Sequence, residues 1–153
     1  MASPQRVLVT GGNSGIGLAL CRQLATEQHG CHVLVGPRDT ARGEAAVASL
    51  ELPADCRLPT APAAVALVTI DVSDDASVVA AAAAHVEASL GGLGGLDGGE
   101  AGGGQEGGGR LHALVNNAGM GLSASATPEQ VMATNLHGTR RVTDVASRFS
   151  AMH

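Results

Sequence analysis

A chain of 153 residues is long enough to form one domain with a buried core. Of its residues 44% are hydrophobic but only one is aromatic, so we expect a core of Val, Leu, Ile and Ala side chains. The net charge of −5, with nine arginines and no lysine, argues against a nucleic-acid or anionic-membrane partner, because neutralising phosphates takes clustered basic residues.

Cysteine spacing and the start of the chain bear on the cellular compartment. Cys21, Cys31 and Cys56 form no C-x-x-C pair, which favours free thiols in a reducing compartment over disulfides or a zinc ribbon. No basic segment followed by an apolar stretch precedes the first strand-like run, so we expect no signal or transit peptide. No apolar run is long enough to span a bilayer. The sequence therefore predicts a soluble, cytoplasmic protein.

Apolar runs closed by turn residues predict four strands, at 6–10, 31–35, 65–70 and 111–115. Apolar residues at helical spacing predict helices at 16–29 and 40–50, a third that follows its N-cap Ser73 to about Leu90, and a fourth after Thr127. Residues 53–62 contain three prolines and are expected to form a loop. Because strands and helices alternate, we expect an α/β fold with a parallel sheet and right-handed crossovers.

The last predicted helix begins with a capping box. Thr127 is the expected N-cap, Pro128 the first helical residue, and Gln130 the residue that completes the box. Helical spacing then predicts a single stripe on one face of this helix, formed by Val131, Met132, Asn135, Leu136, Val142, Val145, Ala146 and Phe149.

Residues 91–109 break the alternation, because twelve of these nineteen residues are glycine and no apolar periodicity remains. This composition is typical of a flexible linker. Lengthening a loop from about 4 to about 19 residues costs only about 1.4 kcal/mol of closure entropy, which a sheet tolerates. We therefore predict one partial domain over residues 1–153, with 91–109 a flexible glycine-rich insertion.

A glycine-rich turn joins the first predicted strand to the first helix, with the sequence Thr10-Gly11-Gly12-Asn13-Ser14-Gly15-Ile16-Gly17. Glycines permit a tight turn and a close approach of the backbone to a ligand, and the helix N-terminus presents N–H groups to a phosphate. Any tight turn can recruit glycines, so this turn indicates nucleotide binding only together with other landmarks.

Three further segments supply those landmarks. Asp71-Val72 follows the third predicted strand, Asn116-Asn117-Ala118-Gly119 follows the fourth, and Thr134-Asn135-Leu136-His137-Gly138-Thr139 lies in the last helix. With the glycine turn, they resemble the N-terminal half of the short-chain dehydrogenase/reductase family, and residues 36–46 look closest to its NADPH-dependent carbonyl reductases. The resemblance covers nearly all of the chain outside the glycine-rich insertion. It implies a Rossmann-like, doubly wound parallel sheet, truncated after about four strands.

Arg38 bears on the choice of cofactor. In this family an acidic residue just after the second strand binds the ribose 2′-hydroxyl of NAD, whereas an arginine accommodates the 2′-phosphate of NADP. Arg38 stands there and Arg42 is placed to assist, so the resemblance favours NADP(H) over NAD(H). The alternative is a solvated arginine at a helix start, although a cation is poorly placed there unless an anion joins it. Ser14 stands where NADP-preferring members often carry a second basic residue.

The resemblance assigns further residues to the dinucleotide. Asp71 and Val72 would border the adenine. Asn117, Ala118 and Gly119 would line the path of the nicotinamide ribose, and the turn would contribute Gly11, Asn13, Ser14, Gly15, Ile16 and Gly17. Asn135 matches the asparagine of the family's proton relay, the one member of the catalytic set in this chain. Taken alone, such residues are also common in turns, and an asparagine within a helix is more often a structural hydrogen-bonding residue.

We expect no metal site. His29, Cys31 and His32 lie close together, but neighbouring residues on one turn into a strand rarely share a metal, and the sequence offers no fourth ligand.

The family's catalytic tyrosine and lysine have no counterpart, because the 153 residues contain neither residue type. The resemblance implies a tyrosine as general acid, a lysine that lowers its pKa and a serine that holds the substrate oxygen. Without the acid, hydride transfer leaves an alkoxide unstabilised. We therefore expect the NADP(H)-binding part of a carbonyl reductase-like oxidoreductase that does not turn over carbonyl substrates as given.

Two alternatives stay open at this point. One is a non-catalytic dinucleotide-binding module, and the other is a partner-binding protein with a vestigial nucleotide site. Because the family's sheet continues beyond the fourth strand, the resemblance also implies that residues 111–115 form an open apolar sheet edge, through which we expect the chain to self-associate.

Overall fold

The computed structural model describes residues 5–27, 31–50, 65–90, 111–121 and 125–151. The strands β1 (Gln5–Thr10), β2 (Cys31–Gly36), β3 (Val65–Leu67) and β4 (Leu111–Val115) form one parallel sheet in the order β3-β2-β1-β4. The predicted loop at 53–62 and the glycine-rich insertion at 91–109 lie outside the described residues.

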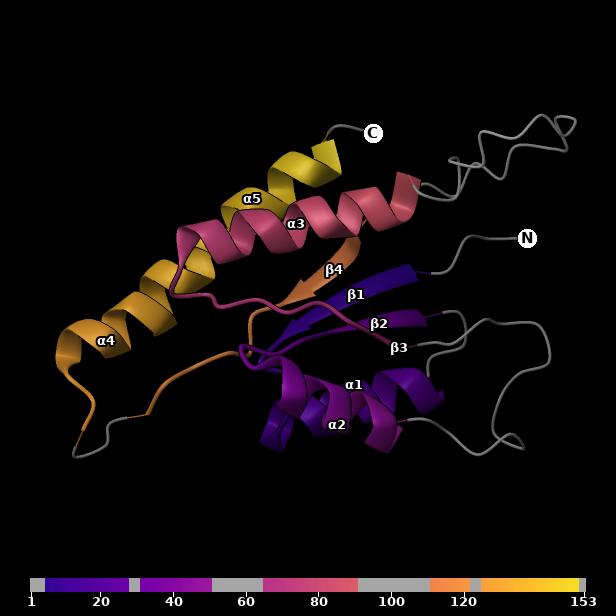
Figure 1. The fold of residues 1–153 in the computed structure, drawn as a ribbon, viewed down its shortest axis with the longest axis horizontal. Coiled ribbons are helices and arrows are strands. Elements are labelled where there is room, and N and C mark those ends of the chain that lie inside the picture. The colour runs from indigo at the N-terminus through magenta and orange to yellow at the C-terminus, as the bar shows by residue number, and fades with distance from the viewer. Residues whose placement is uncertain (1–4, 28–30, 51–64, 91–110, 122–124, 152–153) are drawn as a thin grey trace, which may run out of the picture.

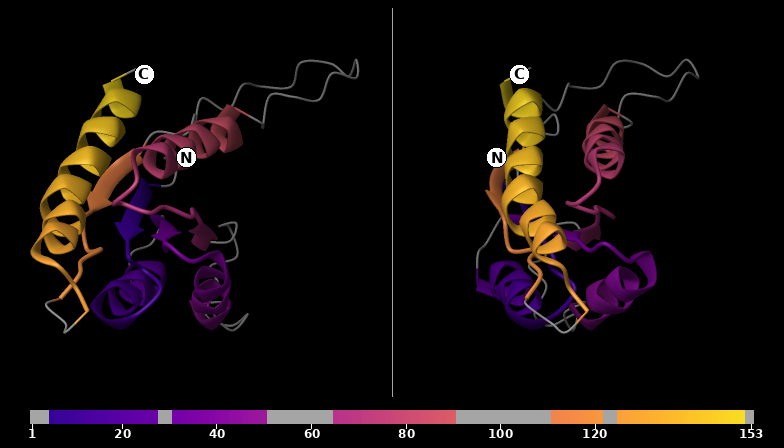
Figure 2. Two further views of the ribbon diagram at one scale, coloured as in Figure 1. Left: turned by 60° about the vertical axis from the view of Figure 1, so that its left-hand side comes forward. Right: turned by 90° about the vertical axis from the view of Figure 1, so that its left-hand side faces the viewer.

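Helices lie on both faces of this sheet. Figure 1 shows α1 (Gly15–Glu27) and α2 (Thr40–Leu50) on one face, with α3 (Asp75–Leu90) and α5 (Thr139–Ala151) on the other, and Figure 2 shows the same layers from two further sides. The chain passes from β1 outward to β3 and then returns to place β4 on the other side of β1. This reversal beside β1 makes the fold a doubly wound α/β sheet of Rossmann type, as the sequence predicts.

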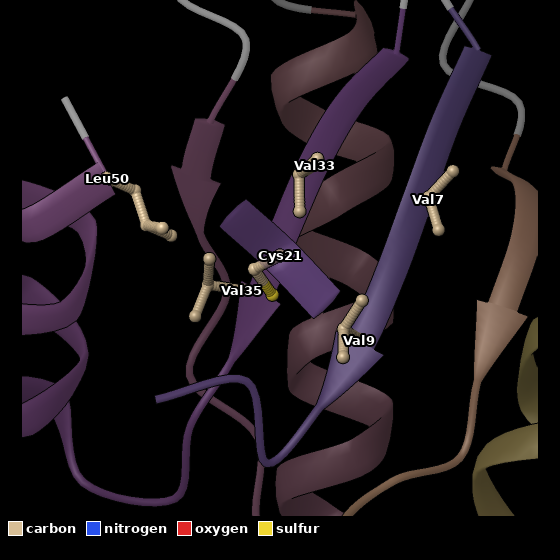
Figure 3. Packing of buried hydrophobic residues seen from close by; sticks show 6 residues of the cluster. All are labelled: Val7, Val9, Cys21, Val33, Val35 and Leu50. Carbon is tan, nitrogen blue, oxygen red and sulfur yellow. The ribbon is translucent and has the colours of Figure 1, made fainter. Parts of the chain in front are cut away.

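The first core lies between the sheet and the helices α1 and α2. Alternate residues of β1 and β2 point toward these helices, where their aliphatic side chains meet a thiol from α1 and a leucine from α2 (Figure 3). The fully or nearly fully buried members of this cluster are Val7, Val9, Cys21, Val33, Val35 and Leu50.

The opposite face of the central strands is buried as well. Leu8 and Leu34, which alternate with the valines, are only 8% and 4% exposed. Helices α3 and α5 pack there, around a second cluster formed by Ile70, Val72, Val78, Ala81 and Val142. Burial on both faces explains why these strands are uninterrupted apolar runs instead of alternating ones.

Two predicted boundaries differ from the structure. β3 ends at Leu67, whereas the sequence predicts a strand to Ile70, although the amides of Val68 and Ile70 still donate to the carbonyls of Val35 and Pro37 at 2.9 and 2.8 Å. The prediction of Ser73 as N-cap of α3 is wrong, because the carboxylate of Asp74 accepts the Ser77 amide at 2.9 Å. The Ser73 hydroxyl instead donates to Asp71 at 2.6 Å.

The last helical segment begins as predicted and then changes its winding. Thr127 and Gln130 form the capping box at the start of α4 (Pro128–Met132), with the proline in the first turn. A π-helix, η3 (Ala133–Gly138), then separates α4 from α5. Because a π-turn inserts a residue into the repeat, positions before and after it no longer share one stripe. Met132 and Leu136 are 48% and 53% exposed, whereas Val142 is buried, so the prediction of a single stripe that includes all three is wrong.

Candidate functional site

A cleft of about 490 Å³ opens where the strands end. Its walls come from the ends of β1, β2, β3 and β4 with the segments that follow them, and from η3. Open α/β sheets bind their ligands at these carboxyl ends, beside the point where the strand order reverses. The lining residues are Gly11, Asn13, Ser14, Ile16, Gly17, Gly36, Arg38, Asp39, Arg42, Ile70, Asp71, Val72, Asn117, Ala118, Gly119, Met120 and Thr134.

The cleft brings together twelve of the thirteen residues that the sequence assigns to a cofactor. These are Gly11, Asn13, Ser14, Ile16, Gly17, Arg38, Arg42, Asp71, Val72, Asn117, Ala118 and Gly119. The thirteenth, Gly15, lies in the same turn with a positive φ of 53° but is not among the lining residues. Asn135 is not among them either.

Sequence reasoning missed five lining residues, namely Gly36, Asp39, Ile70, Met120 and Thr134. Four of them directly adjoin segments that carry predicted site residues, so extending each segment by one or two positions finds them. Thr134 comes from a different element and lies far along the chain, and only its neighbour Asn135 points to it.

The glycine turn adopts a conformation that its sequence requires. Gly11 has a φ of 65°, in the left-handed region that side chains disfavour. A Cβ on Gly17 would lie 2.4 Å from Asn117 Nδ2 and 2.5 Å from the Gly11 carbonyl oxygen. The start of α1 therefore packs directly on the backbone of the turn and on the segment after β4.

Thr10 holds the glycine turn to the segment that follows β4. Its hydroxyl is buried, accepts the amides of Asn117 and Ala118 at 3.1 and 3.0 Å, and donates to the Val115 carbonyl at 3.3 Å. In return, Asn117 Nδ2 donates to the carbonyls of Thr10 and Gly11 at 3.0 and 3.2 Å. These five bonds fix the two cleft walls against each other. Thr10 belongs to the glycine motif, but the sequence of this motif gives no sign that its threonine binds the segment after β4.

The N-terminus of α1 faces the cleft with free amides. The first helical hydrogen bond there runs from the Leu18 amide to the Ser14 carbonyl at 3.1 Å. The three preceding amides, of Gly15, Ile16 and Gly17, have no acceptor within the helix, as at every helix start. Together with the helix dipole, such amides favour an anion.

A second concentration of positive potential follows β2. Arg38 and Arg42 line the cleft beside the N-terminus of α2, and within the described residues neither guanidinium has a hydrogen-bond or ion-pair partner. The N-cap of α2 is Asp39, whose carboxylate accepts the Arg42 amide at 2.8 Å. One end of the cleft is thus lined by two guanidiniums without a partner among the described residues, beside a helix N-terminus.

The wall after β3 is anchored from two helices. The Asp71 carboxylate accepts both the amide and the hydroxyl of Ser73, at 2.9 and 2.6 Å, and the Asp71 amide donates to Ser77 Oγ at 2.8 Å. From α5, Arg141 donates to the Val72 carbonyl at 2.7 Å and also pairs with Asp75. The backbone that carries Asp71 and Val72 is therefore held in place before any ligand arrives.

Asn135 acts on the segment after β4 without lining the cleft. Its side chain is paired with the backbone of Met120: Oδ1 accepts the Met120 amide at 2.7 Å and Nδ2 donates to the Met120 carbonyl at 2.9 Å. Because Met120 lines the cleft, Asn135 connects η3 to the cleft wall.

Cys21 lies beneath the glycine turn. A Cβ on Gly12 would be 2.9 Å from its sulfur, and burial raises the pKa of its thiol to about 11. Such a thiol stays protonated at neutral pH and serves as a small core side chain. No three His, Cys, Asp or Glu side chains of the described residues gather into a metal-ligating cluster, and no described helix has the length and apolarity to cross a membrane.

The sheet order, the cleft position and the glycine turn define an α/β protein of the Rossmann class. Residues 5–105 match the sequence profile of the short-chain dehydrogenase family, which is more than half of the chain. The chain therefore belongs to this family.

Curated relatives and solved structures agree with this assignment. Carbonyl reductase (NADPH) 1 of Pongo abelii is 36% identical over 141 residues, which cover 88% of this chain and 41% of that enzyme. (+)-Neomenthol dehydrogenase of Arabidopsis thaliana is 34% identical over 119 residues, covering 78% of this chain and 32% of its own length. The crystal structure of a variant actinorhodin polyketide ketoreductase with NADPH is 29% identical and superposes with a TM-score of 0.68, covering 99% of this chain and 50% of that one. The chain thus spans half or less of the length of each of these three proteins.

Proposed function

We propose that this chain is the NADP(H)-binding part of a carbonyl reductase-like short-chain dehydrogenase/reductase. The observation that carries the proposal is the pair of guanidiniums of Arg38 and Arg42, which line the cleft beside the start of α2 without partners among the described residues. Two relatives, the carbonyl reductase and the ketoreductase, carry NADPH in their names.

The residues around the cleft fit the parts of this dinucleotide. The amides at the start of α1 would hold the pyrophosphate, and Arg38 and Arg42 would hold the 2′-phosphate. Asp71 and Val72 would border the adenine, while Asn117, Ala118 and Gly119 would line the path of the nicotinamide ribose. When bound, the reduced nicotinamide supplies the hydride of the family's reaction.

Asp39 is the residue that bears on the NAD(H) alternative, because a carboxylate can accept a ribose 2′-hydroxyl. One of its oxygens is already engaged as the N-cap of α2, by the Arg42 amide at 2.8 Å. Beside it, the guanidiniums of Arg38 and Arg42 have no partner among the described residues, and their positive charge favours the phosphate of NADP(H). A hydrogen bond to a charged group contributes about 1.5–3 kcal/mol, or about 10- to 150-fold in affinity.

A charge-reversal variant tests this assignment. We expect Arg38→Asp to weaken NADPH binding by about 10- to 150-fold and to leave NADH binding nearly unchanged, measured by calorimetric titration. Arg148→Asp makes the same change of charge at an exposed site outside the cleft-lining set and serves as the control. Equal NADPH affinity of Arg38→Asp and the parent would contradict the assignment.

We further propose that these 153 residues alone do not reduce carbonyl compounds. They contain no tyrosine and no lysine to supply and tune the proton that the developing alkoxide needs. Pure protein is expected to show no oxidation of NADPH with a broad panel of aldehydes. Measurable turnover in that assay would disprove this part of the proposal. A carbonyl substrate enters the function only in a longer protein that contains these residues.

A non-catalytic dinucleotide-binding or partner-binding module is the second candidate. The missing tyrosine and lysine favour it, as does β4, which pairs with β1 and with no other strand of the described residues. An antibody against this chain, used on its source cells, separates the candidates by mass: a product well above 15.1 kDa supports the reductase, and one at 15.1 kDa supports the module. Fractionation with the same antibody tests the proposed cytoplasmic location, and sedimentation of pure protein tests self-association through β4.

A further inference from the structure

Gly43 of α2 has no room for a side chain. A Cβ there would lie 2.4 Å from Pro37 Cγ and 2.5 Å from Leu67 Cδ1, whereas real Cβ atoms essentially never approach within 3.0 Å. The leucine contact is the end of a flexible side chain, which can turn away. The proline contact is a ring that is fully buried and directly precedes Arg38. Helix α2 therefore packs, at Gly43, against Pro37, the residue that directly precedes Arg38.

Gly43 is also hydrogen-bonded to Asp39, the residue that directly follows Arg38. Its amide donates to the Asp39 carbonyl at 3.0 Å, and the Asp39 side chain accepts the Arg42 amide at 2.8 Å. The segment from Pro37 to Gly43 is thus a turn that hydrogen bonds hold at Asp39 and whose two end residues approach each other closely. Arg38 and Arg42 both lie within this turn, and both line the cleft.

We propose that the contact between Gly43 and Pro37 sets the separation of the Arg38 and Arg42 guanidiniums and thereby determines the selectivity for NADP(H) over NAD(H). The inference rests on the proposed function, since it takes the anion between the two arginines to be the 2′-phosphate. Gly43 and Pro37 do not line the cleft, so both are positioning residues.

The distances indicate how sensitive this arrangement is. To bring a new Cβ from 2.4 Å to an ordinary contact of at least 3.4 Å, α2 and Pro37 must move apart by about 1 Å. Hydrogen bonds from guanidinium to phosphate oxygen span about 2.7–2.9 Å, so after a shift of this size the two arginines must change conformation to reach one phosphate together. The ribose hydroxyl of NAD(H) makes no such demand on the two cations.

The test is Gly43→Ala, with the dissociation constants of NADPH and NADH measured on the full chain. We expect the preference for NADPH to fall by about tenfold, which corresponds to about 1.4 kcal/mol, with NADH affinity unchanged. A purely structural role would weaken the binding of both cofactors together and leave their ratio at the parent's value. Gly121→Ala is the matched control, because a Cβ there meets no atom of the described residues within 4 Å and Gly121 does not line the cleft.

Pro37→Ala provides a second variant, because it removes the other half of the same contact. We expect it to lower the ratio too, and we expect the double variant, in which the new methyl group fills the space of the lost ring, to recover part of it. A folded Gly43→Ala with the parent's ratio would overturn the inference. If that variant does not fold, an unchanged ratio in Pro37→Ala overturns it and a lowered ratio supports it. A parent protein without any preference for NADPH would instead refute the proposed function itself.

Discussion

Gly17→Ala tests whether the glycine turn and the segment after β4 form one rigid unit. The new methyl group would meet Asn117 Nδ2 at 2.4 Å and the Gly11 carbonyl at 2.5 Å. Neither atom can retreat freely, because Asn117 Nδ2 donates to the Thr10 and Gly11 carbonyls at 3.0 and 3.2 Å. Relieving the clash therefore breaks both bonds or displaces the start of α1.

The cost follows from these contacts. Two lost hydrogen bonds cost about 1–3 kcal/mol together, and forcing a methyl group into a packed site costs about 1–3 kcal/mol more. Alanine recovers about 0.5–1 kcal/mol of helix propensity relative to glycine. We expect a net decrease of about 1–5.5 kcal/mol in the free energy of unfolding, together with a loss of NADPH binding.

Urea unfolding of four proteins measures this effect and its origin. The set is the parent, Gly17→Ala, Asn117→Ala and the double variant, with Gly121→Ala as a control expected to stay within about 0.5 kcal/mol of the parent. Because Asn117→Ala removes one of the two clashing atoms, the double variant should be at least about 1 kcal/mol more stable than the sum of the single effects predicts. Strict additivity, or a Gly17→Ala variant as stable as the parent, would refute the reasoning.

Three further predictions concern the supports of the site. Thr10→Val leaves the amides of Asn117 and Ala118 without their acceptor and should lower the free energy of unfolding by about 1–3 kcal/mol in a urea titration. Thr26→Val, on the exposed face of α1, is the control and should change this free energy by less than about 0.5 kcal/mol. Arg141→Met removes the charged donor to the Val72 carbonyl and should cost about 1.5–3 kcal/mol. Asp75→Asn removes only the ion pair between Arg141 and the 81% exposed side chain of Asp75, and it should cost less than about 1 kcal/mol; equal losses would contradict the assignment of the energy to the carbonyl. Burial raises the pKa of Cys21 from its ordinary value of 9.0 to about 11 in the folded chain. The buried thiol therefore contributes its full stability below pH 9, and this contribution is lost as the pH rises from 9 toward 11. Over that range the free energy of unfolding of the parent should fall more steeply than that of Cys21→Ala, and a parallel fall would refute burial as the cause of the raised pKa.

The fold could be predicted from the sequence because its signals are local. The apolar runs of β1 and β2, the capping box at Thr127 and the glycine turn each depend on residues within a few positions of one another. Parallel strands then bring their carboxyl ends to one edge of the sheet, which is why residues from four separate segments meet in one cleft.

The features that the sequence did not predict depend on distant partners or on competing caps. The bonds of Thr10 join residues more than 100 positions apart, and the contact of Arg141 with Val72 spans 69 positions. Ser73 and Asp74 are both good N-caps, and the choice between them is made by Asp71, which occupies the serine hydroxyl. The π-turn at η3 has no pattern of its own in the sequence, and it shifts the face of every later helical residue.

The bonds between Thr10 and the segment after β4 also constrain the order of folding. Two of the cleft's walls follow β1 and β4, the first and last described strands along the chain, so residues 10 and 117 must meet before either of these walls is complete. Contacts of such high sequence separation form late and set a slow folding rate. A ribosome-bound chain that has exposed only β1, α1 and β2 would carry the glycine motif but no binding site. Nucleotide binding is therefore a measure of completed sheet assembly, and a ligand that binds only the assembled sheet stabilises it by mass action.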